Sequence, residues 1–150
     1  MKLNQKLFKN FEKRKINLIT VDGITCSGKS LFAELLKKNL QKDFKEILIL
    51  SKDLFLFSRT KRIEITKKIK NINIYNQNYL HYDLIRLKTL LNFLIGKSSK
   101  RVLTLNNLYN RKTGKNDLKL ILKFSKIRLV IFEGLYVNQD VQFIKKPILK

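Results

Sequence analysis

Three short apolar runs stand out along a chain that is otherwise rich in charged residues. They cover residues 16–21, 46–50 and 128–132 and consist mainly of Ile, Leu, Val and Phe. Runs of this length are typical of strands that are buried on both faces of a parallel sheet. The pattern therefore predicts an α/β fold, a P-loop-type parallel sheet flanked by helices, in one domain over residues 1–150.

Segments with apolar residues at helical spacing accompany these runs. The first follows Ser30 and has its apolar positions at Leu31, Phe32, Leu35, Leu36 and Leu40. The second lies within residues 76–99, ends at Gly96, and has them at Leu84, Leu87, Leu91 and Leu94. Residues 1–15 form a third, basic segment, which we expect to be a leading helix packed on the domain rather than a contact with a membrane or RNA.

The net charge of the chain is strongly positive. It has 33 Lys and Arg residues against 11 Asp and Glu residues, a formal charge of +22. Such a charge is typical of proteins that bind nucleic acids or anionic surfaces. The basic residues are spread along the whole chain, however, and its wealth of Lys, Asn and Ile is the composition that an AT-biased genome produces. We therefore expect no specific nucleic-acid partner.

Cysteine usage and hydropathy bear on the compartment. Cys26 is the only cysteine, so the chain can form neither an internal disulfide nor a cysteine metal cage, which favours the reducing cytoplasm. No apolar run approaches the roughly 20 residues of a membrane span. The charged first fifteen residues are also unlike a signal peptide.

A phosphate-binding pattern lies between the first apolar run and the helix predicted after it. Residues 23–30 read GITCSGKS, with the spacing Gly-x-x-x-x-Gly-Lys-Ser of a P-loop. In such a loop, N–H groups converge on phosphate, the lysine adds positive charge, and the hydroxyl is a ligand for Mg²⁺. The alternative, a turn that only caps a helix, is less favoured by the flanking strand and helix. The candidate nucleotide-binding residues are Gly23, Ile24, Thr25, Cys26, Ser27, Gly28, Lys29 and Ser30.

An acidic residue follows each of the other two apolar runs. Asp53 comes shortly after residues 46–50, and Glu133 follows residues 128–132 directly. Ligands of open α/β sheets bind at the carboxyl ends of the strands. Asp53 by itself fits either a catalytic base or a helix cap, but two such acids beside a P-loop predict a phosphoryl-transfer site.

Four segments together resemble one family, the P-loop kinases of the uridine kinase and phosphoribulokinase group. They are GITCSGKS, SKDLF (residues 51–55), LYNRKTGK (residues 108–115) and VIFEGLYV (residues 130–137), in the family's order. The resemblance implies ATP and Mg²⁺ as cofactors and a hydroxyl of a small molecule, most simply a nucleoside, as phosphate acceptor. It implies that Asp53 is the catalytic base, that Lys29 holds phosphate, and that Ser30 and Glu133 lie at the metal.

A separate set of residues is expected to contact the phosphate acceptor. By the same resemblance the candidates are Phe55, Gln77, Tyr109 and Arg111. Asn110 stands where the family usually has Asp, and Leu56 stands where uridine kinases have a Tyr. Residues 59–70, RTKRIEITKKIK, could attract an anionic substrate, although a solvated helix face is the simpler interpretation. His81, the only histidine, is interpreted as a surface or packing residue.

The segment after Glu133 departs from the family. Family members continue into another strand, an arginine-bearing lid and an adenine-binding segment, whereas the printed sequence continues only to Lys150 and has no Arg after Arg128. The resemblance therefore implies a shortened kinase, with residues 141–150 as a tail in place of the lid. Unless residues 141–146 add a strand, residues 16–21 would form an open sheet edge that favours a homo-oligomer or another partner. The alternative function is an inactive remnant that binds a nucleotide or a polyanion.

Overall fold

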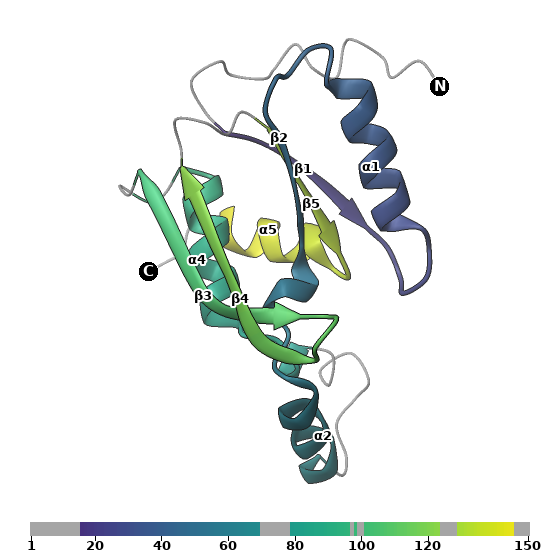
Figure 1. Ribbon diagram of the computed structural model, residues 1–150, viewed down its shortest axis with the longest axis vertical. Coiled ribbons are helices and arrows are strands. Elements are labelled where there is room, and N and C mark those ends of the chain that lie inside the picture. The colour runs from purple at the N-terminus through teal and green to yellow at the C-terminus, as the bar shows by residue number, and fades with distance from the viewer. Residues whose placement is uncertain (1–15, 70–78, 97, 99–100, 124–128, 146–150) are drawn as a thin grey trace.

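The computed structural model describes residues 16–69, 79–96, 98, 101–123 and 129–145. Its centre is a three-stranded parallel sheet in the order β1-β5-β2, formed by β1 (Asn17–Asp22), β5 (Leu129–Gly134) and β2 (Ile47–Ser51) (Figure 1). All six residues of β5, the middle strand, are buried. The predicted α/β fold is confirmed, and its three strands follow the three apolar runs. The predicted leading helix and Gln77 lie outside the described residues.

The register of the sheet brings the carboxyl ends of the three strands together. Glu133 at the end of β5 pairs with Val21 on one side and with Ser51 on the other. The P-loop begins directly after β1, and Asp53 follows β2 in a short 3₁₀ turn, η2 (Lys52–Phe55). One edge of the sheet therefore carries all three groups of the predicted phosphoryl-transfer site.

One face of the sheet is covered by α1 (Lys29–Leu40). Ala33, Leu36 and Leu40 pack against the residues of β5 on that face. The predicted apolar stripe of this helix is buried only in part, because Leu31 is 68% exposed and Leu35 is 49% exposed. These two leucines lie on the part of α1 that is turned away from the sheet, which the sequence pattern does not distinguish from the part that packs.

The other face is covered by α4 (Leu84–Leu94), α5 (Val137–Lys145) and η2 (Figure 1). Most of the predicted stripe of α4 is buried in this larger core. Of the four leucines in that stripe, only Leu84 is exposed. Residues 141–145 belong to α5, so they form no strand beside β1. In the described sheet, β1 is therefore an edge strand.

An antiparallel hairpin completes the larger core. It consists of β3 (Val102–Asn110) and β4 (Lys115–Lys123), two strands that the sequence analysis did not predict. The LYNRKTGK segment forms the tip of this hairpin, and the turn ends at Gly114 with a φ of 72°. The Gly114 carbonyl accepts a hydrogen bond of 2.9 Å from the backbone N–H of Arg59, the first residue of α2 (Arg59–Lys68). Helix α2 has no buried residue, as expected of a solvated helix. No helix in the described ranges is both long and apolar enough to span a membrane.

Candidate active site

The predicted phosphate loop has the geometry that its sequence requires. Gly28 adopts a left-handed conformation with a φ of 80° directly before α1, and Cys26 also has a positive φ of 63°. Thr25 through Leu31 line a cavity of about 540 Å³ at the carboxyl edge of the sheet. The loop therefore places the N-terminus of a twelve-residue helix at this cavity, the arrangement that favours phosphate.

Gly23 and Ile24 lie close to other residues of the loop but outside the cavity lining. A Cβ atom at Gly23 would lie 2.8 Å from the Ser27 hydroxyl oxygen, so a larger residue would require the Ser27 side chain to turn away. The Lys29 ammonium group donates a hydrogen bond to the carbonyl oxygen of Ile24 within the same loop. Ile24 is otherwise 72% exposed, and neither Gly23 nor Ile24 lines the cavity.

Asp53 lies in the same cavity and makes hydrogen bonds with Ser51 and Tyr82. Its backbone N–H donates to the Ser51 hydroxyl at 3.3 Å, which caps the 3₁₀ turn. Its Oδ1 accepts a hydrogen bond of 3.4 Å from the Tyr82 hydroxyl. Burial, and then the charge of Asp53, raise the pKa of Tyr82, so the phenol remains a donor. The cap is therefore supplied by Ser51 and not by the Asp53 carboxylate, which lines the cavity as expected of a base.

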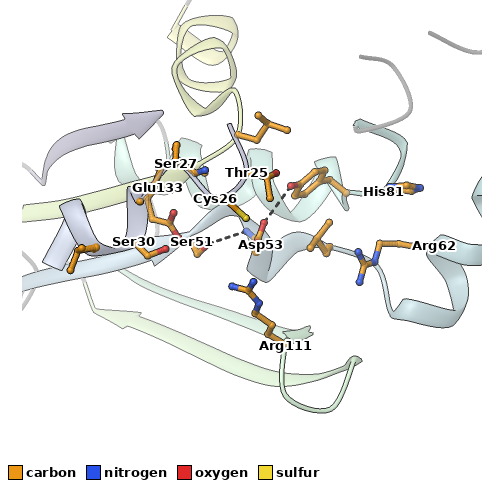
Figure 2. Close-up of a pocket in the computed structure, with 17 residues that line it drawn as sticks. Thr25, Cys26, Ser27, Ser30, Ser51, Asp53, Arg62, His81, Arg111 and Glu133 are labelled. Atoms are coloured by element: carbon orange, nitrogen blue, oxygen red, sulfur yellow. Dashed lines mark hydrogen bonds between the residues drawn. The ribbon is translucent and has the colours of Figure 1, made fainter. Parts of the chain in front are cut away.

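Glu133 and Ser30 fit the donor set of a magnesium site. Glu133 is only 7% exposed, ends the central strand, and lines the cavity together with Ser30. Figure 2 shows Ser30, Ser51 and Glu133 on the same side of Asp53. Among the described residues no three His, Cys, Asp or Glu side chains form a cluster. Magnesium at nucleotide sites is held by one or two protein oxygens together with phosphates and water, so one hydroxyl and one carboxylate are suitable.

A buried lysine that the sequence analysis did not single out lies directly beside Asp53. Lys52 is 1% exposed, and its ammonium group lies 2.6 Å from Asp140 on α5. It also donates a hydrogen bond of 2.9 Å to the carbonyl of Leu135. The rings of Tyr79 and Tyr82 cover it, with centroids 4.7 and 4.9 Å away. Burial raises the pKa of Asp140 even though Lys52 counteracts this effect. The ion pair joins the turn that carries Asp53 to the helix that follows β5.

A second unpredicted contact joins α5 to the P-loop strand. Asp22, the last residue of β1, accepts hydrogen bonds from the backbone N–H groups of Tyr136 at 2.8 Å and Asn138 at 3.2 Å. These N–H groups lie at the start of α5, where a carboxylate stabilises a helix. Helix α5 is thus fixed both to β1 and to the turn after β2.

The remaining wall of the cavity carries cationic and aromatic side chains. Arg62, His81, Tyr82 and Arg111 line it together with Leu56. Figure 2 shows Arg62 and His81 on the side of Asp53 away from Glu133, and Arg111 extending from the hairpin toward the turn that carries Asp53. Of these, only Arg111 was a predicted acceptor contact. Arg62 lies in the segment that the sequence suggested could attract an anion.

Two other predicted acceptor contacts do not line this cavity. Phe55 is 1% exposed and packs in the larger core. Tyr109 is 6% exposed and lies behind Arg62, whose Nη2 donates a 2.9 Å hydrogen bond to the Tyr109 hydroxyl. Tyr109 therefore contacts a residue of the cavity wall, whereas Phe55 belongs to the core, and contact of either with an acceptor stays a prediction.

Several solved structures share this fold. A structure described as a possible uridine kinase from Bacillus stearothermophilus has 19% sequence identity and a TM-score of 0.69, over 93% of this chain and 72% of that chain. A protein assigned as a fructose transport system kinase from Silicibacter sp. TM1040 has 16% identity and a TM-score of 0.65, over 93% and 68%. A D-glycerate 3-kinase from Cryptococcus neoformans has 18% identity and a TM-score of 0.53, over 81% and 43%.

Sequence comparisons add one match. Residues 16–88, a little under half of the chain, match the family model described as chromatin associated protein KTI12. No curated protein matches the chain. The matched range contains the P-loop and Asp53 but ends before Glu133. Together with the structural similarities, these findings show that the chain has the fold of a P-loop kinase, as its four motifs predicted.

Proposed function

We propose that this protein transfers the γ-phosphoryl group of ATP to a hydroxyl group of a small molecule. The observation that carries the proposal is that the P-loop, Asp53 and Glu133, which come from three different strand ends, line one cavity. A loop that only capped a helix would have no need of two carboxylates beside it. Phosphoryl transfer needs a phosphate cradle, a metal ligand and a base in this arrangement.

Each residue of the site has a distinct role in the proposed reaction. The loop N–H groups and Lys29 bind the β- and γ-phosphates, and Lys29 must exchange its contact with the Ile24 carbonyl for one with phosphate. Ser30 and Glu133 would hold Mg²⁺, which when bound neutralises charge on the phosphates. Asp53 takes the proton of the acceptor hydroxyl. A bond forms between the acceptor oxygen and the γ-phosphorus. The bond between the γ-phosphorus and the β,γ-bridging oxygen breaks, which yields ADP and a phosphorylated acceptor.

The resemblance to uridine kinases makes a nucleoside the simplest acceptor, and the exposed thiol of Cys26 is compatible with the reducing cytoplasm. A catalytically inactive protein that binds nucleotide through the same loop is the competing function. Binding requires only the loop, whereas transfer also requires the base and the metal ligands. The two functions therefore differ in whether phosphate reaches an acceptor.

Transfer of label from γ-labelled ATP to a panel of nucleosides and small alcohols tests this proposal. We expect Asp53→Asn to abolish transfer with little change in ATP affinity, because a base acts on the acceptor. Lys29→Ala should weaken ATP binding, whereas Lys37→Ala, which removes the same charge further along α1, should not. ATP binding without transfer to any acceptor would favour the inactive protein, and equal affinities of the two lysine variants would refute the phosphate loop.

A further inference from the structure

The cavity carries two arginines at the end where, on the proposed function, the acceptor would bind. In the proposed reaction, Lys29 binds the nucleotide, Glu133 holds the metal and Asp53 takes the proton. Arg62 and Arg111 are not used by any of these steps, although both line the same cavity. Within the described parts of the chain, neither arginine forms an ion pair with a carboxylate.

Arg62 is held in a fixed orientation by the protein. Its Nε donates to the Phe57 carbonyl at 3.1 Å, its Nη2 donates to the Tyr109 hydroxyl at 2.9 Å, and its guanidinium lies over the Tyr109 ring at 4.9 Å. A guanidinium has further N–H donors beyond these two. Arg62 is only partly exposed, so it differs from a solvated surface cation. Three contacts that orient a cation without neutralising it indicate a prepared site for an anion.

Arg111 lines the same cavity from the tip of the hairpin, on a turn with its own internal hydrogen bonds. The Asn110 side chain accepts a 3.0 Å hydrogen bond from the N–H of Lys112, and the Asn110 carbonyl accepts one of 2.8 Å from Gly114. The bond from Arg59 to Gly114 joins this turn to α2, the helix that carries Arg62. The two arginines therefore come from elements that are fixed to each other. Figure 2 shows the Arg111 guanidinium directed toward the turn that carries Asp53.

The other side chains at this end add no negative charge. His81 shares a 3.1 Å hydrogen bond with the Thr66 hydroxyl, and Tyr82 is bonded to Asp53. Leu56, an uncharged residue, lines the same cavity. An uncharged nucleoside would leave both guanidinium groups without a charged partner. A carboxylate or a phosphate would form charge-assisted hydrogen bonds with them, and guanidinium groups match the geometry of these anions.

We propose that the acceptor is a small alcohol that carries a carboxylate or phosphate group, which Arg62 and Arg111 hold so that the hydroxyl reaches Asp53. This proposal rests on the proposed kinase activity and replaces the uncharged nucleoside, which the resemblance makes the simplest acceptor, with an anionic alcohol. It assigns binding of the acceptor to residues of α2 and of the hairpin turn. The nucleotide and its metal occupy the opposite end of the cavity.

Matched pairs of acceptors test the proposal. Transfer from γ-labelled ATP is compared for ribose and ribose 5-phosphate, for glycerol and glycerol 3-phosphate, and for glycerol and glycerate, with uridine as an uncharged nucleoside. We expect kcat/KM to be at least about tenfold higher for an anionic member of a pair than for its uncharged partner. The phosphate and carboxylate arms show which anion is preferred. Equal or better use of uridine and the uncharged alcohols would overturn the proposal and leave the kinase activity standing.

Variants assign the effect to the two arginines. Arg111→Gln and Arg62→Lys should each lower kcat/KM for the anionic acceptor by about 10- to 100-fold, chiefly through KM. Lys112→Gln removes one charge from the same turn but lies outside the cavity lining, so it should change kcat/KM less than twofold. Equal losses in Arg111→Gln and Lys112→Gln would show a general charge effect and overturn the proposal. Thermal melting shows whether Arg62→Lys, which alters a packed contact, remains folded.

Binding measurements keep the proposal testable if no transfer occurs. Protein saturated with Mg²⁺ and a non-hydrolysable ATP analogue, which occupies the P-loop, is titrated with glycerol 3-phosphate and with glycerate. Binding that is at least tenfold weaker in Arg111→Gln than in Lys112→Gln would support the anion site while the kinase activity itself failed. The absence of binding to either anion would overturn the inference independently of catalysis.

Discussion

Lys52 and Asp140 form an ion pair of 2.6 Å between the turn after β2 and helix α5, with side chains that are 1% and 8% exposed. Burying the charge of a lysine costs much free energy unless an opposite charge is paired with it. Its neighbour in sequence, Asp53, faces the cavity. The ion pair therefore fixes to α5 the turn that contains the candidate base, Asp53.

Removing one member of this pair should strongly destabilise the protein. We expect Asp140→Asn to lower the free energy of unfolding by about 3–5 kcal/mol, because it leaves the Lys52 ammonium buried without a counter-charge. Urea denaturation measures the change. Arg86→Gln breaks the more exposed pair of Arg86 with Asp83, and we expect a cost of about 1 kcal/mol or less. Similar losses in the two variants would mean that Lys52 reaches water.

Gly134 allows β5 to approach the turn that carries Asp53. A Cβ atom at this position would lie 2.6 Å from Cβ of Lys52 and 3.1 Å from Val137, and the residue has a φ of 155°. We expect Gly134→Ala to cost about 2–3 kcal/mol in urea denaturation and to lower the transfer rate, because the clash displaces η2.

Gly96→Ala is the matched control for this clash. Gly96 also has a positive φ, 76°, but its Cβ would meet nothing within 4 Å. Backbone strain alone should therefore cost it about 1 kcal/mol, with no effect on transfer. If both alanine variants lost equal stability, strain would account for the whole effect and the close approach to Lys52 would not matter.

The parts of the site that the sequence predicted are the parts that local patterns define. The P-loop is a contiguous motif, and Asp53 and Glu133 follow apolar runs whose length and composition indicate parallel strands. Position at a strand end was then enough to bring these residues to one edge. The residues of this group that the structure describes all lie at that edge.

Contacts between segments that are distant in sequence could not be predicted in this way. Nothing in the sequence distinguishes Lys52 from the other lysines, because its partner Asp140 lies on α5. The contact of Arg62 with Tyr109 likewise joins α2 to the distant hairpin. The hairpin itself was missed because the alternation of Leu103 and Leu105 in β3 is broken before Leu108. The register shifts there, and Asn107 has a positive φ of 55°.

The pKa of His81 reports both its burial and the charge of Arg62, at the end of the cavity where we propose that the acceptor binds. Burial, and then the charge of Arg62, lower its pKa below the 6.5 of an unperturbed imidazole. As the only histidine, it can be titrated without ambiguity by NMR. We expect a pKa below 6.5 in the native protein and a value nearer 6.5 in Arg62→Gln. Arg86→Gln should leave it unchanged.

The same shift has a consequence for stability. Because the folded state favours the neutral imidazole, the contribution of His81 to stability is fully present above pH 6.5 and is lost as the pH falls from there through the lowered pKa. The pH dependence of urea denaturation should therefore be weaker in His81→Asn over this window. A histidine pKa at or above 6.5 would contradict both expectations.

Tyr82 should act as a positioning residue for Asp53. Its hydroxyl donates the 3.4 Å hydrogen bond to Oδ1, while its ring covers Lys52 at 4.9 Å. Tyr82→Phe removes the hydrogen bond and keeps the ring. For a bond of this length we expect kcat to fall by about five- to tenfold, with the KM for ATP unchanged, because the base touches the acceptor and not the nucleotide. Steady-state kinetics with a saturating acceptor separate the two constants.

Tyr79→Phe is the control that separates positioning from packing. Its ring covers Lys52 at 4.7 Å, as the Tyr82 ring does, and burial of the ammonium group depends on both rings. We expect the kcat of Tyr79→Phe to stay within about twofold of the native value, since its hydroxyl bonds with Asp140, whereas the phenol that bonds with Asp53 is that of Tyr82. Any loss of stability in Tyr79→Phe reports the hydrogen bond of its hydroxyl with Asp140, because the ring over Lys52 is retained. If Tyr82→Phe lost stability but kept its kcat, the phenol would support the fold alone, and the carboxylate of Asp53 would be positioned by η2 without it.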